Sequence, residues 1–145
     1  MFRRDVIATA GLAAMALASK VALADDHEHM HHDHGAMGNT KLVESASTCI
    51  KAGDTCIAHC LQSFAAGDTS LAACAKSVNE MLSICSSLQK LASLGSAHLA
   101  EMSKLALSIC LECEKECRKH EQQHDTCKAC ADACSACADE CRKAA

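Results

Sequence analysis

Five cysteines recur at intervals of three and four residues near the C-terminus, in the run CKACADACSACADEC over residues 127–141. Because an α-helix repeats every 3.6 residues, these intervals place all five thiols on one face of one helix. Residues 112–145 contain no Leu, Ile, Val, Met or Phe. A helix formed here can therefore turn only cysteine and alanine toward a core, and this constrains the fold more than any other feature of the sequence.

Helix signals divide the rest of the chain into segments of similar length. There is no proline, and the only aromatic residues are two phenylalanines, so helix is favoured over sheet. Breaks containing glycine at 66–68 and 94–96, and a polar stretch at 122–125, separate the segments. The expected helices lie near residues 40–66, 68–94, 96–121 and 125–143. Short connections between them predict an all-α, antiparallel up-down-up-down four-helix bundle over residues 40–145.

The cysteines share one face of every expected helix, within about 80° of one another at about 100° per residue. This placement predicts a cysteine-lined core, completed by Val78, Met81, Leu88, Leu99 and Ala106. All thirteen cysteines are candidate metal ligands: Cys49, Cys56, Cys60, Cys74, Cys85, Cys110, Cys113, Cys117, Cys127, Cys130, Cys134, Cys137 and Cys141.

Thiols in such positions could also form disulfides or simply fill space in the core. Disulfides cannot use an odd number of cysteines completely, and cysteines three or four apart on one helix reach disulfide geometry poorly. Bridges between helices stay open as an alternative. Simple space filling is disfavoured, because Leu or Val would gain about 1.5–3 kcal/mol each on burial. Metal ligation explains why the core forgoes the stability that buried Leu or Val would provide.

The spacing favours Cu(I) among the metals that thiolates bind. Structural zinc takes closed sets of four ligands, usually from turns, and iron–sulfur clusters draw cysteines from irregular loops. Cu(I) is a soft ion that accepts pairs or triplets of thiolates, which neighbours at i, i+3 and i+4 can supply. We therefore expect many Cu(I) ions, roughly one per cysteine. Zinc or mixed-metal sequestration and detoxification is the alternative function.

Histidines gather at one end of the expected bundle. His59, His120 and His124 lie near the helix ends that carry Cys60 and Cys127, and we expect copper to be taken up there, with the histidines as ligands at the mouth. The opposite end has no cysteine before Cys110 on the third helix. We expect Ala97, Leu99 and Leu105 to close it.

The N-terminus is typical of an export signal. Residues 1–24 combine Arg3-Arg4, an apolar stretch and an Ala-Leu-Ala cleavage pattern, so we expect export to the periplasm, by the twin-arginine route. Cleavage after Ala24 would leave a His/Met-rich flexible tail over residues 25–39. That tail would begin Asp-Asp-His, and a free amine with His27 in third position offers Cu(II) a planar set of nitrogens.

The residues resemble a known family. An export signal, a His/Met-rich tail, the spacing of Cys49, Cys56 and Cys60, and the five-cysteine run 127–141 are similar to the exported copper storage proteins. The resemblance implies a four-helix bundle whose core thiolates bind many Cu(I) ions taken up at one end, often in a homo-oligomer. It implies storage or buffering, with copper enzymes or chaperones as recipients, and no catalysis.

Composition disfavours several other functions. The formal net charge is −4, and Lys and Glu alternate along the helices, so no basic stripe is available for nucleic acid. Nothing after residue 24 is apolar enough to span a membrane. A catalytic thiol needs an accessible thiolate beside a base, whereas these thiols are expected in a core. The sequence thus predicts a binding protein and not an enzyme.

Overall fold

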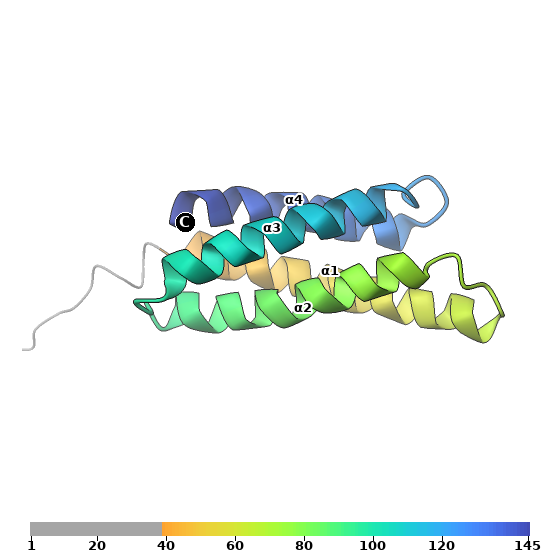
Figure 1. The fold of residues 1–145 in the computed structure, drawn as a ribbon, viewed down its shortest axis with the longest axis horizontal. Coiled ribbons are helices and arrows are strands. Elements are labelled where there is room, and N and C mark those ends of the chain that lie inside the picture. The colour runs from red at the N-terminus through yellow and green to blue at the C-terminus, as the bar shows by residue number, and fades with distance from the viewer. Residues whose placement is uncertain (1–38) are drawn as a thin grey trace, which may run out of the picture. The chain divides into compact units, whose positions relative to one another are not determined.

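The computed structural model describes residues 39–145, which form four helices and contain no strand. The helices are α1 (Thr40–Ala65), α2 (Ala72–Ser93), α3 (Leu99–Arg118) and α4 (Asp125–Ala144). Each helix packs against its two neighbours in the ring α1–α2–α3–α4, and successive helices run in opposite directions (Figure 1). The predicted all-α, up-down-up-down bundle is confirmed. The expected export signal and the tail with His27 lie outside the described residues.

Glycines end the first two helices where the sequence analysis expects breaks. Gly67 and Gly95 have φ of 84° and 58°, a left-handed conformation that side chains with a Cβ adopt at a cost. After α1, the N–H of Asp68 donates to the carbonyl of Ser63 at 3.0 Å, and the N–H of Ser96 donates to Leu91 at 3.0 Å after α2. These six-to-one hydrogen bonds close the helix ends and let the chain reverse.

Three helix ends differ from the expected positions by three residues or more. Helix α2 begins at residue 72, not 68, because Asp68 Oδ1 accepts a hydrogen bond from the N–H of Ser70 at 2.8 Å and holds a turn before the helix. Helix α3 begins at 99, not 96, where Ser96 Oγ accepts from the N–H of His98 at 3.2 Å. It ends at Arg118, three residues before the expected 121, and turns lead on to α4.

Polar contacts fasten neighbouring helices outside the core. Arg118 at the end of α3 donates to Glu114, to Glu121 in the connection, and to Asp132 of α4, at 3.2, 2.9 and 2.6 Å. Between α1 and α2, Gln89 Nε2 donates to Ser47 Oγ at 2.6 Å. Such pairs add modest stability at the surface and help set the register of the hairpins.

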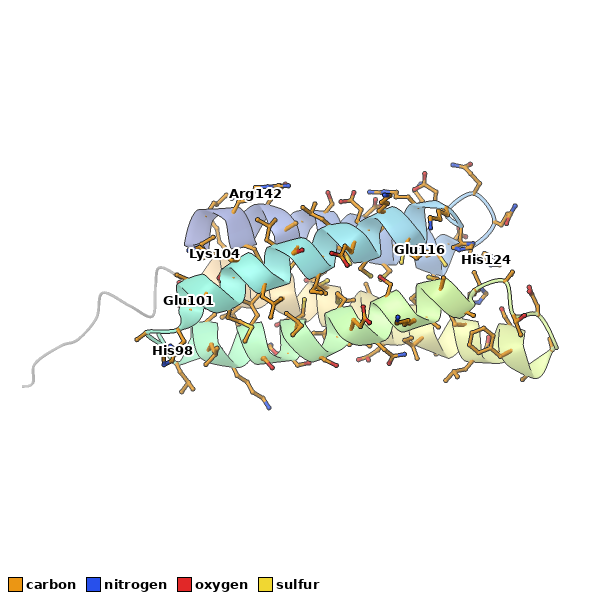
Figure 2. All side chains as sticks on the ribbon, viewed as in Figure 1. His98, Glu101, Lys104, Glu116, His124 and Arg142 are labelled. Carbon is orange, nitrogen blue, oxygen red and sulfur yellow. The ribbon has the colours of Figure 1, made fainter. Side chains whose placement is uncertain are left out.

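The two ends of the bundle differ. The connections α1–α2 and α3–α4 lie at one end, here called the histidine end, where His124 is found (Figure 2). The connection α2–α3 lies at the other, here called the leucine end, where His98 is found. Over residues 39–145, no helix combines the length and apolar character needed to cross a bilayer.

Leucines and small residues close the leucine end, but they are not the ones expected. Leu42, Ala46, Leu88, Ala92 and Ala106 are buried there. The expectation that Ala97, Leu99 and Leu105 close this end is wrong for Ala97 and Leu105, whereas Leu99 packs against the core. Ala97 is exposed, Leu99 is half-buried, and Leu105 is 46% exposed. Leu105 precedes the inward Ala106 by one residue, which turns it about 100° away from the core.

Candidate metal centre

All thirteen cysteines are fully buried, and all are free thiols. The alternative of disulfides between helices is therefore wrong for this structure. The inward positions repeat at intervals of three and four on every helix, as in α1, where Leu42, Ala46, Cys49, Gly53, Cys56 and Cys60 are buried. In α4 the same interval brings Cys127, Cys130, Cys134, Cys137 and Cys141 into the core beside Ala131 and Ala138.

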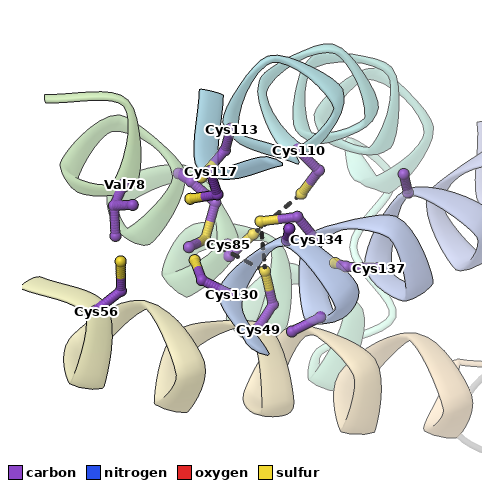
Figure 3. Close-up of a cluster of buried hydrophobic side chains, with 14 of the residues drawn as sticks. Cys49, Cys56, Val78, Cys85, Cys110, Cys113, Cys117, Cys130, Cys134 and Cys137 are labelled. Atoms are coloured by element: carbon purple, nitrogen blue, oxygen red, sulfur yellow. Dashed lines mark hydrogen bonds between the residues drawn. The ribbon is translucent and has the colours of Figure 1, made fainter. Parts of the chain in front are cut away.

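The sulfurs from different helices gather into overlapping groups (Figure 3). Within each group the Sγ atoms lie within 4.8 Å of one another. One group has four thiols, and three groups have three: Cys49–Cys85–Cys110–Cys137, Cys56–Cys74–Cys127, Cys56–Cys117–Cys130 and Cys113–Cys130–Cys134. Two sulfurs bound to one ion by bonds of about 2.3 Å can be at most about 4.6 Å apart, so each group suits a shared ion with little movement.

Close sulfur pairs link these groups along the bundle. Cys74 Sγ lies 3.6 Å from Cys117 Sγ and 3.9 Å from Cys56 Sγ at the histidine end. Farther along, Cys85 Sγ lies 3.6 Å from Cys110 Sγ, and Cys49 Sγ lies 3.6 Å from Cys134 Sγ. Cys56 and Cys130 each belong to two groups. The sulfurs therefore form a connected column through the bundle.

The environment of the thiols shifts their pKa values. Burial raises the pKa of Cys60 to about 11 and that of Cys127 to about 12, and the charge of Cys56 adds to both shifts. Hydrogen bonding to Cys110 raises the pKa of Cys85. The hydrogen bond from Cys134 is the main cause that lowers the pKa of Cys110, to about 5. A metal ion that enters this network must displace the protons that the sulfurs share.

Three histidines stand at the histidine end. His59 Nε2 of α1 and His124 Nδ1, at the start of α4, are 2.9 Å apart and hydrogen-bonded. The His120 ring, in the α3–α4 connection, has its centroid 6.5 Å from that of His124, and its Nε2 lies 3.9 Å from Glu116 Oε1. All three are half-buried, so their rings remain within reach of solvent. The structure thus brings together the three residues that the sequence analysis assigned to the mouth.

Two features of the core were not predicted from the sequence. Gly53 is buried in the cysteine column of α1, and Ser103 is fully buried on α3 with no hydrogen-bond partner for its hydroxyl. The interval of three and four residues from Cys49 to Cys56 and from Cys110 back to Ser103 places both on the inward faces. The interval is visible in the sequence, but the predicted inward residues were cysteines and apolar residues and included neither this glycine nor this serine.

A groove on the surface is separate from these sulfurs. It runs between α1 and α4 and is lined by Thr48, Ala52, Thr55, Ala129, Ala133 and Ala136 among others. No cysteine lines it. The candidate metal centre is therefore the interior of the bundle and not a surface pocket.

Comparison with known proteins points to one family. Residues 35–145 match the copper storage protein family, Csp. The cysteine-rich protein YhjQ of Bacillus subtilis strain 168, described as uncharacterized, is 35% identical over 89 residues, which are 61% of this chain and 79% of that protein.

Solved structures show the same fold. The Cu(I)-bound copper storage protein BsCsp3 superposes with a TM-score of 0.67 at 32% identity, covering 74% of this chain and 98% of that one. The apo form of Csp3 from Bacillus subtilis gives 0.63 at 34% identity, over 71% and 94% of the two chains. Ccsp from Streptomyces lividans, loaded with 10 copper equivalents, gives 0.68 at 21% identity over 74% and 83%, a likeness of fold.

Proposed function

The chain belongs to the copper storage protein family, and we propose that it stores or buffers many Cu(I) ions on the thiolates of its core, roughly one per cysteine. The observation that carries this proposal is the set of thirteen buried, unbridged thiols, all of which except Cys60 and Cys141 belong to groups of three or four sulfurs drawn from different helices. Thiolates are the ligands that Cu(I) prefers.

Binding would proceed by exchange of protons for metal. Each ion takes the place of thiol protons between two or three sulfurs, and the helices already hold those sulfurs within 4.8 Å of one another. Because Cys56 and Cys130 are shared between groups, an ion can pass from one group to the next without leaving sulfur. His59, His120 and His124 would receive the ion first, since they surround the histidine end of the column.

The same geometry supports binding rather than catalysis. Every thiol is buried, and the close contacts of the cysteine sulfurs described above are with other sulfurs. A nucleophilic cysteine needs both access and a base. We therefore propose that the protein acts by taking up and releasing copper, with copper enzymes or chaperones as recipients.

Export completes the proposal. The sequence pattern of residues 1–24 supports secretion to the periplasm, by the twin-arginine route, which carries folded proteins. The tail that follows, with His27 as a Cu(II) ligand, would capture copper outside the bundle. Sequencing the N-terminus of the exported protein tests both statements, because a first residue other than Asp25 removes the Cu(II) site.

Zinc sequestration is the second candidate, and one observation favours it. The group Cys49–Cys85–Cys110–Cys137 offers four sulfurs, the number that zinc takes in closed sites. The other groups among the described residues hold three. Zinc would therefore fill this group well and use the remaining thiols poorly.

A metal titration of the reduced, exported protein separates the two. We expect about one Cu(I) per thiol, close to the thirteen cysteines, against a competing chelator, with unchanged helicity by circular dichroism. Saturation at about three tightly held Zn²⁺ ions, with weak or no uptake of Cu(I), would overturn the storage proposal. Elemental analysis of the protein isolated from its own compartment then identifies the metal that it carries.

A further inference from the structure

We propose that Met81 is a ligand for Cu(I) in the middle of the core, beside Cys49, and that Gly53 is the residue that makes room for its thioether. This inference rests on the proposed function, since it concerns the same column of sulfurs. It assigns a metal-binding role to a residue that the sequence analysis placed in the core as a packing residue.

The sulfur column has a gap on α2 that Met81 fills. The cysteines of α2 are Cys74 and Cys85, which are separated by about 16 Å along the helix at 1.5 Å per residue. The inward residues between them are Val78 and Met81, both fully buried. In contrast, α4 turns a cysteine inward at almost every helical turn. Met81 carries the only sulfur of α2 within that gap.

The thioether sulfur of Met81 lies close enough to a thiol of the candidate metal centre for both to bind one ion. The Cys49 thiol donates a hydrogen bond to Met81 Sδ, and the two sulfurs are 3.3 Å apart. Two sulfurs that share an ion can be up to about 4.6 Å apart, so an ion bound to Cys49 is within reach of Met81. When Cys49 loses its proton to bind metal, the lone pair of Met81 Sδ is left facing the bound ion.

Gly53 explains why the thioether fits at this position. It occupies the inward position between Cys49 and Cys56, where a Cβ would lie 2.7 Å from Met81 Cε and 2.8 Å from Leu82 Cδ2. Glycine within a helix is less favourable than alanine. An alanine here with a smaller residue at position 81 would fill the core without that cost. The pair instead keeps a sulfur at the centre of the bundle.

A thioether ligand differs chemically from the thiolates around it. Methionine sulfur is soft and suits Cu(I), yet it is neutral and has no proton to lose. A Cu(I) site in which Met81 replaces a thiolate therefore carries one negative charge fewer in the buried core. Because one proton fewer is released, copper binding at this site is also less dependent on pH than binding at an all-thiolate group.

Selenium substitution gives a direct test. The exported protein is prepared with selenomethionine, loaded anaerobically with Cu(I), and measured by X-ray absorption at the selenium edge. We expect a selenium–copper path in the loaded protein that is lost in Met81→Leu and kept in Met102→Leu. Met102 is the matched control because it lies on α3 as a partly buried neighbour of the same core. The tail residues Met30 and Met37 are present in both variants.

The possible outcomes separate this inference from the proposed function. If the protein loads with Cu(I) but Met81→Leu leaves the selenium–copper signal unchanged, Met81 only fills space, and storage by the thiols still stands. If the protein takes up no Cu(I), both ideas fail. Leucine has a volume close to that of methionine, so Met81→Leu is expected to fold. Its helicity and unfolding midpoint confirm this before the absorption measurement.

Discussion

The histidine end and the leucine end of the bundle are built from different materials. At the histidine end the inward residues include Cys60, Cys74, Cys117 and Cys127, with Leu71 as the large aliphatic side chain. At the leucine end the inward residues include Leu42 and Leu88 with Ala46, Ala92 and Ala106, beside one cysteine, Cys141 of α4. Each buried leucine contributes about 1.5–3 kcal/mol, more than a small thiol can. The comparison shows that the aliphatic residues of the leucine end provide much of the stability of the bundle, so that the rest of the core can consist of cysteines, the candidate metal ligands.

The largest effect is expected from Leu88→Ala at the leucine end. Leu88 is fully buried, so its truncation leaves a cavity and should lower the free energy of unfolding of the apo protein by about 2–5 kcal/mol. The copper capacity of the surviving folded protein should not change, because no sulfur is removed. Urea denaturation and Cu(I) titration measure the two quantities.

Leu94→Ala is the control for this experiment. Leu94 lies at the same end but is 78% exposed, so its truncation should change stability by less than about 0.5 kcal/mol. Equal effects of the two substitutions would contradict the assignment of stability to the buried leucines.

A smaller loss is expected from Gly53→Ala, midway between the ends. The new Cβ would overlap Met81 Cε and Leu82 Cδ2, and overpacking of this kind costs about 1–3 kcal/mol. The added methyl group would otherwise favour helix, so a stabilised variant would show that the core has room to spare at this level. Combining Gly53→Ala with Met81→Leu tests whether the two sites are coupled, by a double-mutant cycle in urea.

The pH dependence of stability should reveal the thiols of the histidine end. The pKa values of Cys60 and Cys127 are raised in the folded protein to about 11 and about 12, above the value of about 8.5 for an unfolded cysteine. The folded state therefore holds more protons in this range, and stability should be intact below pH ~8 and should fall as pH rises toward 11–12. Denaturation midpoints of the reduced apo protein measure the fall.

Two comparisons isolate the thiols from other groups that titrate at high pH. In the Cys60→Ala, Cys127→Ala double variant the fall should be shallower, because two raised pKa values are gone. Copper-loaded protein should lack the part of the fall that comes from thiols already deprotonated by metal. A pH profile identical in all three samples would show that these thiols do not contribute.

The smallest effect on stability, but a clear one on kinetics, is expected from His59→Ala. The ring of His59 is half-buried and hydrogen-bonded to His124 at the surface, so its removal should cost little stability. Loading with Cu(I) should be several-fold slower if ions are taken up at the histidine end. His98→Ala, at the leucine end, is the matched control, and stopped-flow loading of both variants at the wild-type rate would refute uptake at this end.

The fold could be predicted from sequence because a chemically distinct residue marks the inner face. Cysteines at intervals of three and four on each segment fix the rotation of every helix, and glycines at 67 and 95 mark where two of them end. The helix starts were less accessible, since Asp68 and Ser96 cap turns that precede the helices and do not begin them. The periodic spacing of the inward residues does not show whether such a side-chain hydrogen bond holds a turn or begins a helix.

The candidate site was predictable in its residues but not in its contacts. The inward phase of each helix is a property of one segment, whereas the groups of three and four sulfurs depend on the axial alignment of four segments. The error at the leucine end had a different cause. Leu105 was predicted to close this end because it is an aliphatic residue before the first cysteine of the third helix, although it lies about 140° from Cys110 around the helix. The contact of Cys49 with Met81 required the close approach of α1 and α2 that Gly53 permits.

The complete burial of the thirteen thiols has a consequence for how the protein resists oxidation. A small oxidant or a partner disulfide must reach a sulfur before it can react, and here every cysteine is sealed from solvent. Oxidation of the metal-free protein then requires transient opening of the bundle, so the half-life of its reduced form depends on how often the bundle opens. The buried aliphatic residues, which hold the helices together, would in this way slow the oxidation of the cysteine sulfurs.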